Sequence, residues 1–219
     1  MSDKPFFSVI VPAYNSAGHI TKLLDSIKAQ SFTDYELIVV CDSCDDNTAD
    51  VARSYGANVL EVNYHLDGLT RNAGLDVATG EWVLFADDDD WFIHEYCFKQ
   101  IADIVGKHGE DAIVFSYIWK GHGYYRQTPE NLSVQVWSKC WRRSFIGNTR
   151  FSFRHYWSDC DFHNKIMRKP HKFVYWDMLI YYYNFERKNS QTKLVMDNEA
   201  KHYTAHPSRV LLYDTSIRS

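Results

Sequence analysis

The amino-acid sequence predicts an α/β fold in which a mostly parallel, Rossmann-like sheet is flanked by helices. Three observations support this prediction. Short apolar runs rich in Val, Ile and Leu recur along the first half, segments with apolar residues at helical spacing separate them, and polar, Gly or Pro residues close each one. Such an alternation is typical of parallel sheets, because helices bury both faces of the strands. With 219 residues and 45% hydrophobic side chains, the chain can bury one sizeable core.

The first half contains the clearest strand and helix signals. Its opening run is apolar and β-branched, and we expect this strand to end at Pro12. The second apolar run is followed by a polar turn and a helix that stops at Gly56. In order along the chain, the expected strands are 6–12, 36–40, 58–62 and 81–86, and the expected helices are 20–27, 49–55 and 69–78.

The second half is less regular, and no linker, repeat or low-complexity segment separates it from the first. We therefore expect one domain, residues 1–219, in which 94–219 elaborates on 1–93. Its many Tyr and Trp side chains suit a packed core or a groove that stacks on rings, and we favour the core. The expected elements are helices at 94–107 and 157–168, a strand at 111–117, a hairpin-like segment at 121–136 and an extended segment at 172–185.

Charge and composition restrict the class of protein. A net charge of −4 and a pI near 6.2 give no electrostatic reason to expect nucleic acid as a partner. No stretch of eighteen apolar residues and no signal-peptide pattern occurs, which predicts a cytoplasmic protein that is soluble or contacts a membrane peripherally.

Five widely spaced cysteines do not form a disulfide framework and indicate a reducing compartment. Cys41 and Cys44 have the C-x-x-C spacing of a redox motif. We do not expect redox chemistry from them, because the chain is larger than a thioredoxin-like domain and no second pair supplies a zinc site.

Four consecutive aspartates, Asp87 to Asp90, follow the fourth expected strand. Crowded carboxylates repel one another, and a bound divalent cation relieves this repulsion. Carboxylate oxygens suit Mg²⁺ or Mn²⁺, which accompany phosphates. The alternative is a solvated acidic turn or helix start, where aspartates are common. Ligands of parallel sheets bind at the carboxyl ends of the strands, which is where these aspartates are expected to lie.

Several short blocks of the sequence carry a specific combination of motifs. In chain order they are FSVIVPAYN at 7–15, LIVVCDSCDDNT at 37–48, TRNAGL at 70–75, ATGE at 78–81, FADDDDW at 85–91, VWSK at 136–139, YWSDCDF at 156–162 and YNFERKNS at 183–190. Together they resemble the motifs of glycosyltransferase family 2, and the resemblance covers roughly residues 6–192.

The resemblance implies a GT-A fold, with a nucleotide-sugar-binding half at 1–93 and a smaller, mixed acceptor-side half at 94–219. It implies an inverting glycosyltransferase that moves a sugar from a UDP-sugar, or another pyrimidine nucleotide sugar, to an acceptor hydroxyl with Mn²⁺ or Mg²⁺. A glycan, a lipid-linked intermediate, a protein or a small molecule could each be the acceptor. The sequence specifies neither the sugar nor the oligomeric state.

On the donor side, the D-x-D motif of the family matches Asp87 and Asp89. The resemblance implies that Asp89 holds the metal, with Asp87 beside it or on the ribose, and that Asp88 also faces the nucleotide sugar. The metal would stabilise the diphosphate as it leaves. Two late residues, His202 and His206, are candidates for completing the metal shell, although an isolated histidine is more often structural.

The nucleotide itself needs contacts at the ends of the first two strands. Asp42, at a solvent-facing strand end, can accept the imide N–H of uracil, and Tyr14, next to Pro12, can stack on the ring. The resemblance places Arg71 near the base and phosphates, where a guanidinium forms charge-assisted bonds. The alternative for Arg71 is a salt bridge that fixes the 63–72 loop. In the loop that contains Arg187 and Ser190, both residues are candidates for binding diphosphate or acceptor.

The resemblance favours Asp159 as the general base that takes the proton of the acceptor hydroxyl. Asp161 points elsewhere on a helix, and Ser158 occupies the position where the family usually has glutamate. The alternative is that Asp159 and Asp161 are helix N-terminal charges and that Ser158 caps the helix. Trp137 is expected in the core rather than as a platform for a sugar.

Two other functions stay open. A nucleotide-binding scaffold without turnover is compatible with the departures at Ser158 and in the 41–44 loop. A sugar nucleotidyltransferase would need a Gly-rich phosphate loop after the first strand, and Pro12-Ala13-Tyr14-Asn15 is not such a loop.

Overall fold

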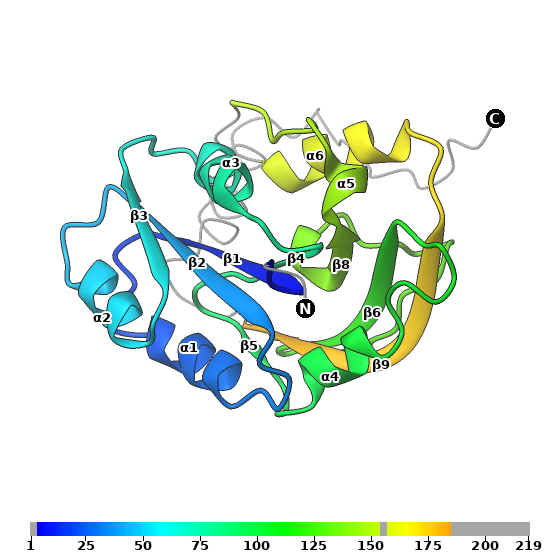
Figure 1. Cartoon of the computed structure of the whole chain (residues 1–219), viewed down its shortest axis with the longest axis horizontal. Helices are drawn as coiled ribbons and strands as arrows, with labels where there is room; N and C mark the ends of the chain where they lie inside the picture. The colour runs from blue at the N-terminus through cyan, green and yellow to red at the C-terminus, as the bar shows by residue number, and fades with distance from the viewer. Residues whose placement is uncertain (1–3, 154–156, 185–219) are drawn as a thin grey trace, which may run out of the picture. The chain divides into compact units, whose positions relative to one another are not determined.

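The computed structural model describes residues 4–153 and 157–184, which lie in a compact unit that ends at Asn184. In these residues nine strands form one sheet with the order β3-β2-β1-β4-β8-β6-β9-β5, and β7 also pairs with β6. Helices α1, α2 and α4 lie below the sheet in the view of Figure 1, and α3, α5 and α6 lie above it. The predicted α/β fold is confirmed. The expectation of one domain through residue 219 extends beyond the described residues and stays a prediction.

The strands of the described residues are β1 (Phe7–Ala13), β2 (Tyr35–Asp42), β3 (Asn58–Val62), β4 (Trp82–Phe85), β5 (Trp91–Phe92), β6 (Ala112–Trp119), β7 (Gly123–Tyr125), β8 (Lys139–Arg142) and β9 (Phe173–Tyr183). The α-helices are α1 (Ile20–Lys28), α2 (Thr48–Ser54), α3 (Asp67–Val77), α4 (Cys97–Ala102), α5 (Arg143–Ile146) and α6 (Ser158–Met167), and a 3-10 turn spans Val136–Ser138.

The first half forms the parallel part of the sheet. Strands β3, β2, β1 and β4 are adjacent and parallel; the apolar side chains of β1, β2 and β4 are buried, and those of the edge strand β3 are partly buried. The expectation that the first strand ends at Pro12 is wrong, because β1 continues to Ala13 and Pro12 pairs with Val40. The proline is tolerated because β1 pairs with β4 only over residues 7–10, so the missing N–H lies beyond the end of that ladder.

The second half adds a mixed part to the sheet. Strand β8 runs antiparallel to β4 and β6, whereas β9 runs parallel to β6 and antiparallel to β5. Because β5, β8 and α5 are short, the sequence pattern did not predict them. The predicted helix at 94–107 is wrong in length: α4 spans only Cys97–Ala102, and Gly106 and Gly109, both with positive φ, occupy the turns that follow.

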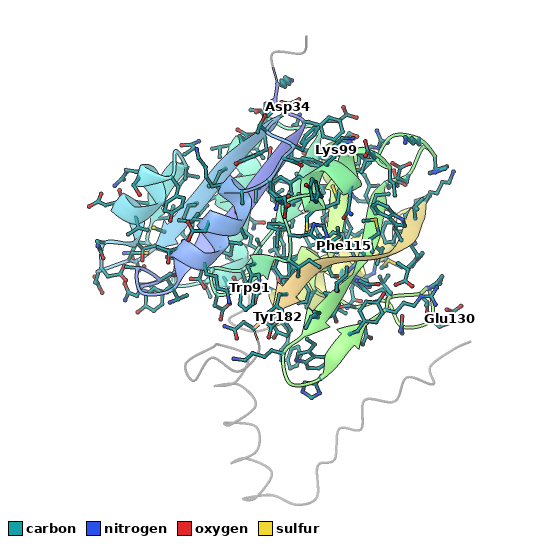
Figure 2. The ribbon with its side chains drawn as sticks, turned by 90° about the horizontal axis from the view of Figure 1, so that it is seen from below. Asp34, Trp91, Lys99, Phe115, Glu130 and Tyr182 are labelled. Atoms are coloured by element: carbon teal, nitrogen blue, oxygen red, sulfur yellow. The ribbon has the colours of Figure 1, made fainter. Side chains whose placement is uncertain are left out.

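Aromatic side chains form much of the second half's core, as favoured from composition. Trp137 is 2% exposed and stacks on the buried Tyr181, with ring centroids 4.9 Å apart, so it belongs to the core. Figure 2 shows Trp91 and Tyr182 side by side, and their rings stack at 4.0 Å to join β5 to β9. Among the described residues, no helix has the length and hydrophobicity needed to cross a membrane.

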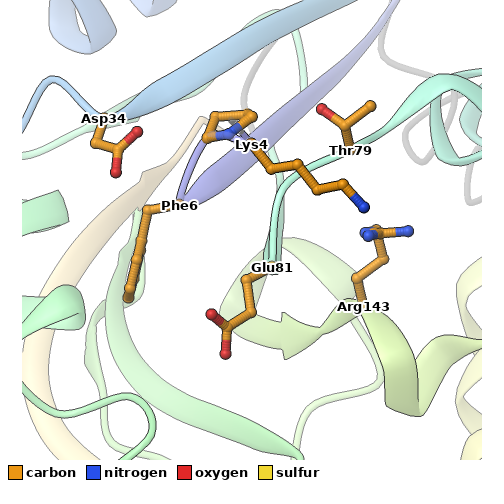
Figure 3. Close-up of a pocket in the computed structure, with 7 residues that line it drawn as sticks. Lys4, Phe6, Asp34, Thr79, Glu81 and Arg143 are labelled. Carbon is orange, nitrogen blue, oxygen red and sulfur yellow. The ribbon is translucent and has the colours of Figure 1, made fainter. Parts of the chain in front are cut away.

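A pocket of about 290 Å³ lies at the end of the sheet where β1 and β4 begin. Figure 3 shows Lys4 and Arg143 on one side of it and Phe6 and Asp34 on the other. The acidic run follows the carboxyl end of β4, so this pocket lies at the opposite end of the strands and is separate from the site described next.

Candidate active site

The loops that follow β1, β2 and β4 meet at the carboxyl ends of these strands. Ser16 donates its backbone N–H to the hydroxyl of Thr48 at 2.7 Å, and Ala17 donates its N–H to Asp46 at 3.1 Å. The loop after β1 also contacts the acidic run, because Ser16 donates its hydroxyl to Asp88 and the Tyr14 N–H lies 3.4 Å from the same oxygen. These contacts bring the segments expected to bind the nucleotide to one edge of the sheet.

The side chains of the acidic run have distinct partners. Asp87 accepts from Arg71 at 2.7 Å, whereas Asp88 lies 3.5 Å from His19 and contacts the loop after β1. Asp90 is fully buried and accepts the Asn184 N–H at 2.7 Å. The alternative of a solvated acidic turn is therefore wrong for Asp90, whereas Asp87, Asp88 and Asp89 are partly exposed. Its backbone is held from β9, since the Asp87 N–H donates to the hydroxyl of Tyr181 at 2.9 Å.

Crowding perturbs the ionisation of this run. Burial raises the pKa of Asp87 to about 7; Arg71 opposes the shift, while Asp159, Asp67 and Asp89 add to it. Burial, together with Asp89 and Asp87, also raises the pKa of Asp90 well above its usual range. A cation beside Asp87 would favour its ionised form.

Arg71 joins three carboxylates from three parts of the chain. Its guanidinium is 5% exposed, and it pairs with Asp67 on its own helix, with Asp87 at 2.7 Å and with Asp159 at 3.7 Å. The alternative expected for Arg71 was a salt bridge that fixes the 63–72 loop. Its pair with Asp67 is such a salt bridge within these residues. The same side chain also connects the acidic run to α6.

Asp159 lies at the start of α6 with its side chain 20% exposed. Its Oδ2 accepts the Val136 N–H at 3.1 Å, and its Oδ1 lies on the side of Arg71. Burial raises the pKa of Asp159, and Arg71 opposes the shift. Asp161 instead pairs with Lys165 one turn later, at 2.6 Å. The two carboxylates therefore have separate environments.

Ser158 does not cap α6. The preceding residue, Trp157, is the N-cap with φ of 65°, and no side-chain capping bond is present. The Ser158 hydroxyl donates instead to Asp67 at 2.9 Å. The capping expectation is therefore wrong, because α3 lies close enough to supply a charged acceptor.

Asp42 does not face solvent as expected. It is 6% exposed, and its two oxygens accept from Thr70 and from the backbone N–H groups of three loop residues, Tyr64, His65 and Leu66. Burial raises the pKa of Asp42, but these hydrogen bonds outweigh burial and hold it below its usual range. The solvent-facing role is wrong because the 63–66 loop folds over the end of β2.

The remaining expected residues have different outcomes. Tyr14 is 53% exposed next to the acidic run, so stacking on a base stays a prediction for it, and Pro12 lies inside β1. Arg187, Ser190, His202 and His206 lie outside the described residues. Cys41 and Cys44 are free cysteines, and burial raises the pKa of both thiols, which does not suit a redox motif.

Two residues of this site, Asp67 and Lys139, were not predicted from the sequence. Asp67 stands four residues before Arg71, a spacing that could have predicted their pairing on a helix. Lys139 is fully buried, and its Nζ donates to the carbonyl oxygens of Ser133 and Gln135, at 2.5 and 3.0 Å. Lys139 lies in the VWSK block, but nothing in the neighbouring sequence indicated that its side chain would be buried.

The residues expected to hold a metal are Asp87 and Asp89. Within residues 4–153 and 157–184, no group of three His, Cys, Asp or Glu side chains could hold a metal ion. Asp87 and Asp89 provide hard oxygen donors, and Mg²⁺ is commonly held by one or two carboxylates together with substrate phosphates. The side chains fit a metal that the substrate helps to bind.

Comparisons with known proteins agree with this geometry. Residues 8–172 match the family model described as Glycosyl transferase family 2. Glycosyltransferase GlyA of Streptococcus pneumoniae is 27% identical over 85% of this chain and 31% of its own length. Poly(ribitol-phosphate) beta-N-acetylglucosaminyltransferase TarS of Staphylococcus aureus is 39% identical over 49% of this chain and 20% of its own length. The chain thus spans less than a third of either relative.

Solved structures show the same fold. The crystal structure of S. aureus TarS 1–349 in complex with UDP-GlcNAc has a TM-score of 0.72 and 25% identity, and covers 84% of this chain and 59% of that one. A mannosyltransferase from Pyrobaculum calidifontis, with 16% identity and a TM-score of 0.69, covers 86% of this chain and 59% of its own.

Proposed function

Since this chain belongs to glycosyl transferase family 2, we propose that it transfers a sugar from a UDP-sugar to an acceptor hydroxyl with inversion at the anomeric carbon. The observation that carries the proposal is the position of Asp159. Its carboxylate is partly exposed, has a raised pKa and is joined through Arg71 to the acidic run where the diphosphate would lie. TarS, in the structure with UDP-GlcNAc, supports a uridine nucleotide as donor.

In the proposed reaction the acceptor oxygen attacks the anomeric carbon and the bond to the nucleoside diphosphate breaks. Asp159 takes the acceptor proton, because it lies beside the acidic run and a raised pKa makes it a better base. Tyr14 is assigned to the base ring and Asp88 to the loop that holds Tyr14. Arg71 holds Asp87 next to the expected phosphates.

Asp87 and Asp89 would hold Mn²⁺ or Mg²⁺. When bound, the metal would stabilise the negative charge of the leaving diphosphate. The acceptor is proposed to be a polyhydroxyl compound, such as the poly(ribitol-phosphate) in the name of TarS. A cytoplasmic location and peripheral membrane contact stay predictions.

Turnover with a panel of UDP-sugars and Mn²⁺ tests the proposal. We expect UDP release in Mn²⁺ and little in EDTA. Asp159→Asn should keep UDP binding, measured by calorimetry, and lower kcat by a factor on the order of 10² to 10⁴, because an amide of the same shape cannot accept a proton. Asp161→Asn is the matched control and should be much milder.

The other outcomes identify the alternatives. UDP binding without turnover of any donor would favour the nucleotide-binding scaffold, and formation of a nucleotide sugar with release of pyrophosphate would favour a nucleotidyltransferase. An Asp161→Asn defect larger than that of Asp159→Asn would show that the base is Asp161.

A further inference from the structure

The first residues of α3 and α6 are in direct contact. Asp67 begins α3 and Ser158 begins α6, and the Ser158 hydroxyl donates to Oδ2 of Asp67 at 2.9 Å. The two helix starts also approach closely, because a Cβ added at Gly68 would lie 3.2 Å from Cβ of Ser158, and 2.8 Å from the Ser152 carbonyl oxygen in the segment before α6. The start of α6, with Asp159 in its first turn, is therefore fixed against the start of α3.

Arg71 is shared unequally among its carboxylate partners. Nη1 donates to Asp67, whereas the same nitrogen lies 3.7 Å from Oδ1 of Asp159, beyond hydrogen-bond range. Nη2 donates to Asp87 at 2.7 Å. In the part of the chain described, the buried Nε has no hydrogen-bond partner, so carboxylates accept the hydrogen bonds of the guanidinium, which also lies 5.7 Å from the centre of the Phe151 ring.

We propose that Asp67 is a positioning residue for the transfer reaction, which holds Nη1 of Arg71 away from Asp159 and, through Ser158, orients the first turn of α6. The role rests on the proposed function. Without the Asp67 carboxylate, Nη1 would move to Asp159, because a buried cation needs an anionic partner. The ion pair between Arg71 and Asp159, now at 3.7 Å, would then tighten into a hydrogen-bonded one, and Asp159 would be a weaker base.

The electrostatics of the site agree with this arrangement. Burial raises the pKa of Asp159, Arg71 opposes that shift, and Asp67 adds to it. Asp67 thus keeps Asp159 basic in two ways, by its own charge and by holding the cation. Asp76, on the same helix, forms a comparable but exposed pair with Arg150 at 2.8 Å and is remote from these contacts.

The first test is the Asp67→Asn variant, which keeps the shape and the acceptor for Ser158 but removes the charge. We expect kcat to fall on the order of 10-fold or more, while the dissociation constant of UDP changes by less than about threefold. In the crystal structure of the variant, the Nη1 to Asp159 distance should shorten to about 2.8 Å, an ordinary ion-pair distance. Asp76→Asn should change neither quantity.

The second test exchanges the two residues. Asp67→Ser alone should lose kcat, and Asp67→Ser combined with Ser158→Asp should recover part of it, because the carboxylate returns to the same contact from α6. If Asp67 had a purely structural role, the loss of kcat in each variant would follow its loss of melting temperature, and kcat would not recover independently of stability.

Each of these measurements either supports or overturns the role of Asp67. An active wild-type chain whose Asp67→Asn variant retains its kcat, or whose Arg71 to Asp159 distance stays near 3.7 Å, would overturn the role of Asp67 alone. An exchange variant no more active than Asp67→Ser would also overturn it. A wild-type chain that turns over no nucleotide sugar would overturn the proposed function and this role with it.

Discussion

At the residue scale, the acidic run shows that neighbours of one type can have different chemistry. Asp87 remains 27% exposed and is paired with a cation, whereas Asp90, three residues later, is fully buried. One oxygen of Asp90 accepts the Asn184 N–H, and the other has no hydrogen-bond partner among the described residues. Burial, together with Asp89 and Asp87, raises the pKa of Asp90 well above its usual range, so this environment disfavours the charged carboxylate.

Asp90→Asn should therefore be nearly neutral for stability. The amide oxygen can accept the Asn184 N–H, and the amide keeps the shape of a side chain whose charged form is disfavoured by burial. Asp90→Ala should lower the free energy of unfolding by about 1–3 kcal/mol, since it leaves a partly buried N–H without its acceptor. Urea unfolding at pH 7 measures both. Equal losses for the two variants would contradict this prediction.

Asp42 is the residue whose role the structure changes most. Its carboxylate accepts from Thr70 and from three backbone N–H groups of the 63–66 loop. We expect Asp42→Ala to lower the free energy of unfolding by at least about 2 kcal/mol, because several buried donors lose their acceptor. Weaker UDP binding should follow from the loosened loop. The exposed Asp45 provides the control, and an Asp42→Ala variant as stable as Asp45→Ala would disprove the anchoring role.

At the element scale, α3 positions most of the site. It carries Asp67 and Arg71, and it packs on β1 and β2 through Gly74. A Cβ at Gly74 would lie 2.4 Å from Cγ2 of the buried Ile10, a distance that forces the helix or the strand to shift. The close approach of helix and strand is therefore a condition for the contacts of Arg71.

Gly74→Ala should destabilise the protein and reduce turnover together. Ala is favoured over Gly in a helix by about 1 kcal/mol, but overpacking a core costs typically about 1–3 kcal/mol, so the net change should be a loss. Gly18→Ala is the control, because nothing lies within 4 Å of the added Cβ there. Thermal unfolding and UDP release measure the two effects. An unchanged melting temperature for Gly74→Ala would show that α3 can move away from β1 freely.

The sequence predicted the elements of the first half because their signal is local. The buried residues of α1, such as Leu23 and Ile27, recur at helical spacing, and the apolar runs of β1 and β2 are long. Strands β5 and β8 were missed because two and four residues carry little periodicity, and their pairing partners lie far away in the sequence.

The site was predictable in part for the same reason. Clustering of loops after parallel strands follows from the fold, and it brought Tyr14, Asp42 and the acidic run to one edge of the sheet. The partners of Asp42 and of Lys139 were not predictable, because they depend on how the 63–66 loop and the 133–138 segment fold back. The contact between Arg71 and Asp159 joins residues far apart in the sequence and required the structure.

At the scale of the whole molecule, the two halves of the chain depend on each other at the acidic run. The hydroxyl of Tyr181, in β9, accepts the Asp87 N–H. Asn184, directly after β9, donates its N–H to Asp90. The segment before β8 holds Asp159 through the Val136 N–H. The second half, which is expected to bind the acceptor, therefore also orders the loop expected to bind the donor.

Lys139 links this arrangement to the global stability. Its terminal amino group is fully buried against the Ser133 and Gln135 carbonyl oxygens and the Ser138 hydroxyl. Burial lowers its pKa to about 7, with Asp159 opposing the shift. An unfolded lysine has a pKa of about 10.4, so between these values the unfolded chain binds the proton that the folded chain has lost. Lys139 therefore makes the free energy of unfolding increase with pH from about 7 to about 10.

Lys139→Met removes this contribution, so the stability of the wild type relative to the variant should grow as the pH rises. The expected slope is at most about 1.4 kcal/mol per pH unit, the value for one proton. Urea unfolding at several pH values in this window measures it, and Lys99→Met, at an exposed site on α4, is the control that should show no such trend. The direction of the trend distinguishes two cases. A lysine that gained an anionic partner on folding would have a raised pKa, and its contribution to the free energy of unfolding would be lost as the pH rises. A wild-type advantage that stays constant or shrinks with pH would mean that Lys139 is charged in the folded protein. The 133–138 segment, and with it the Val136 N–H that holds Asp159, would then be fixed by an ammonium ion rather than by a neutral amine.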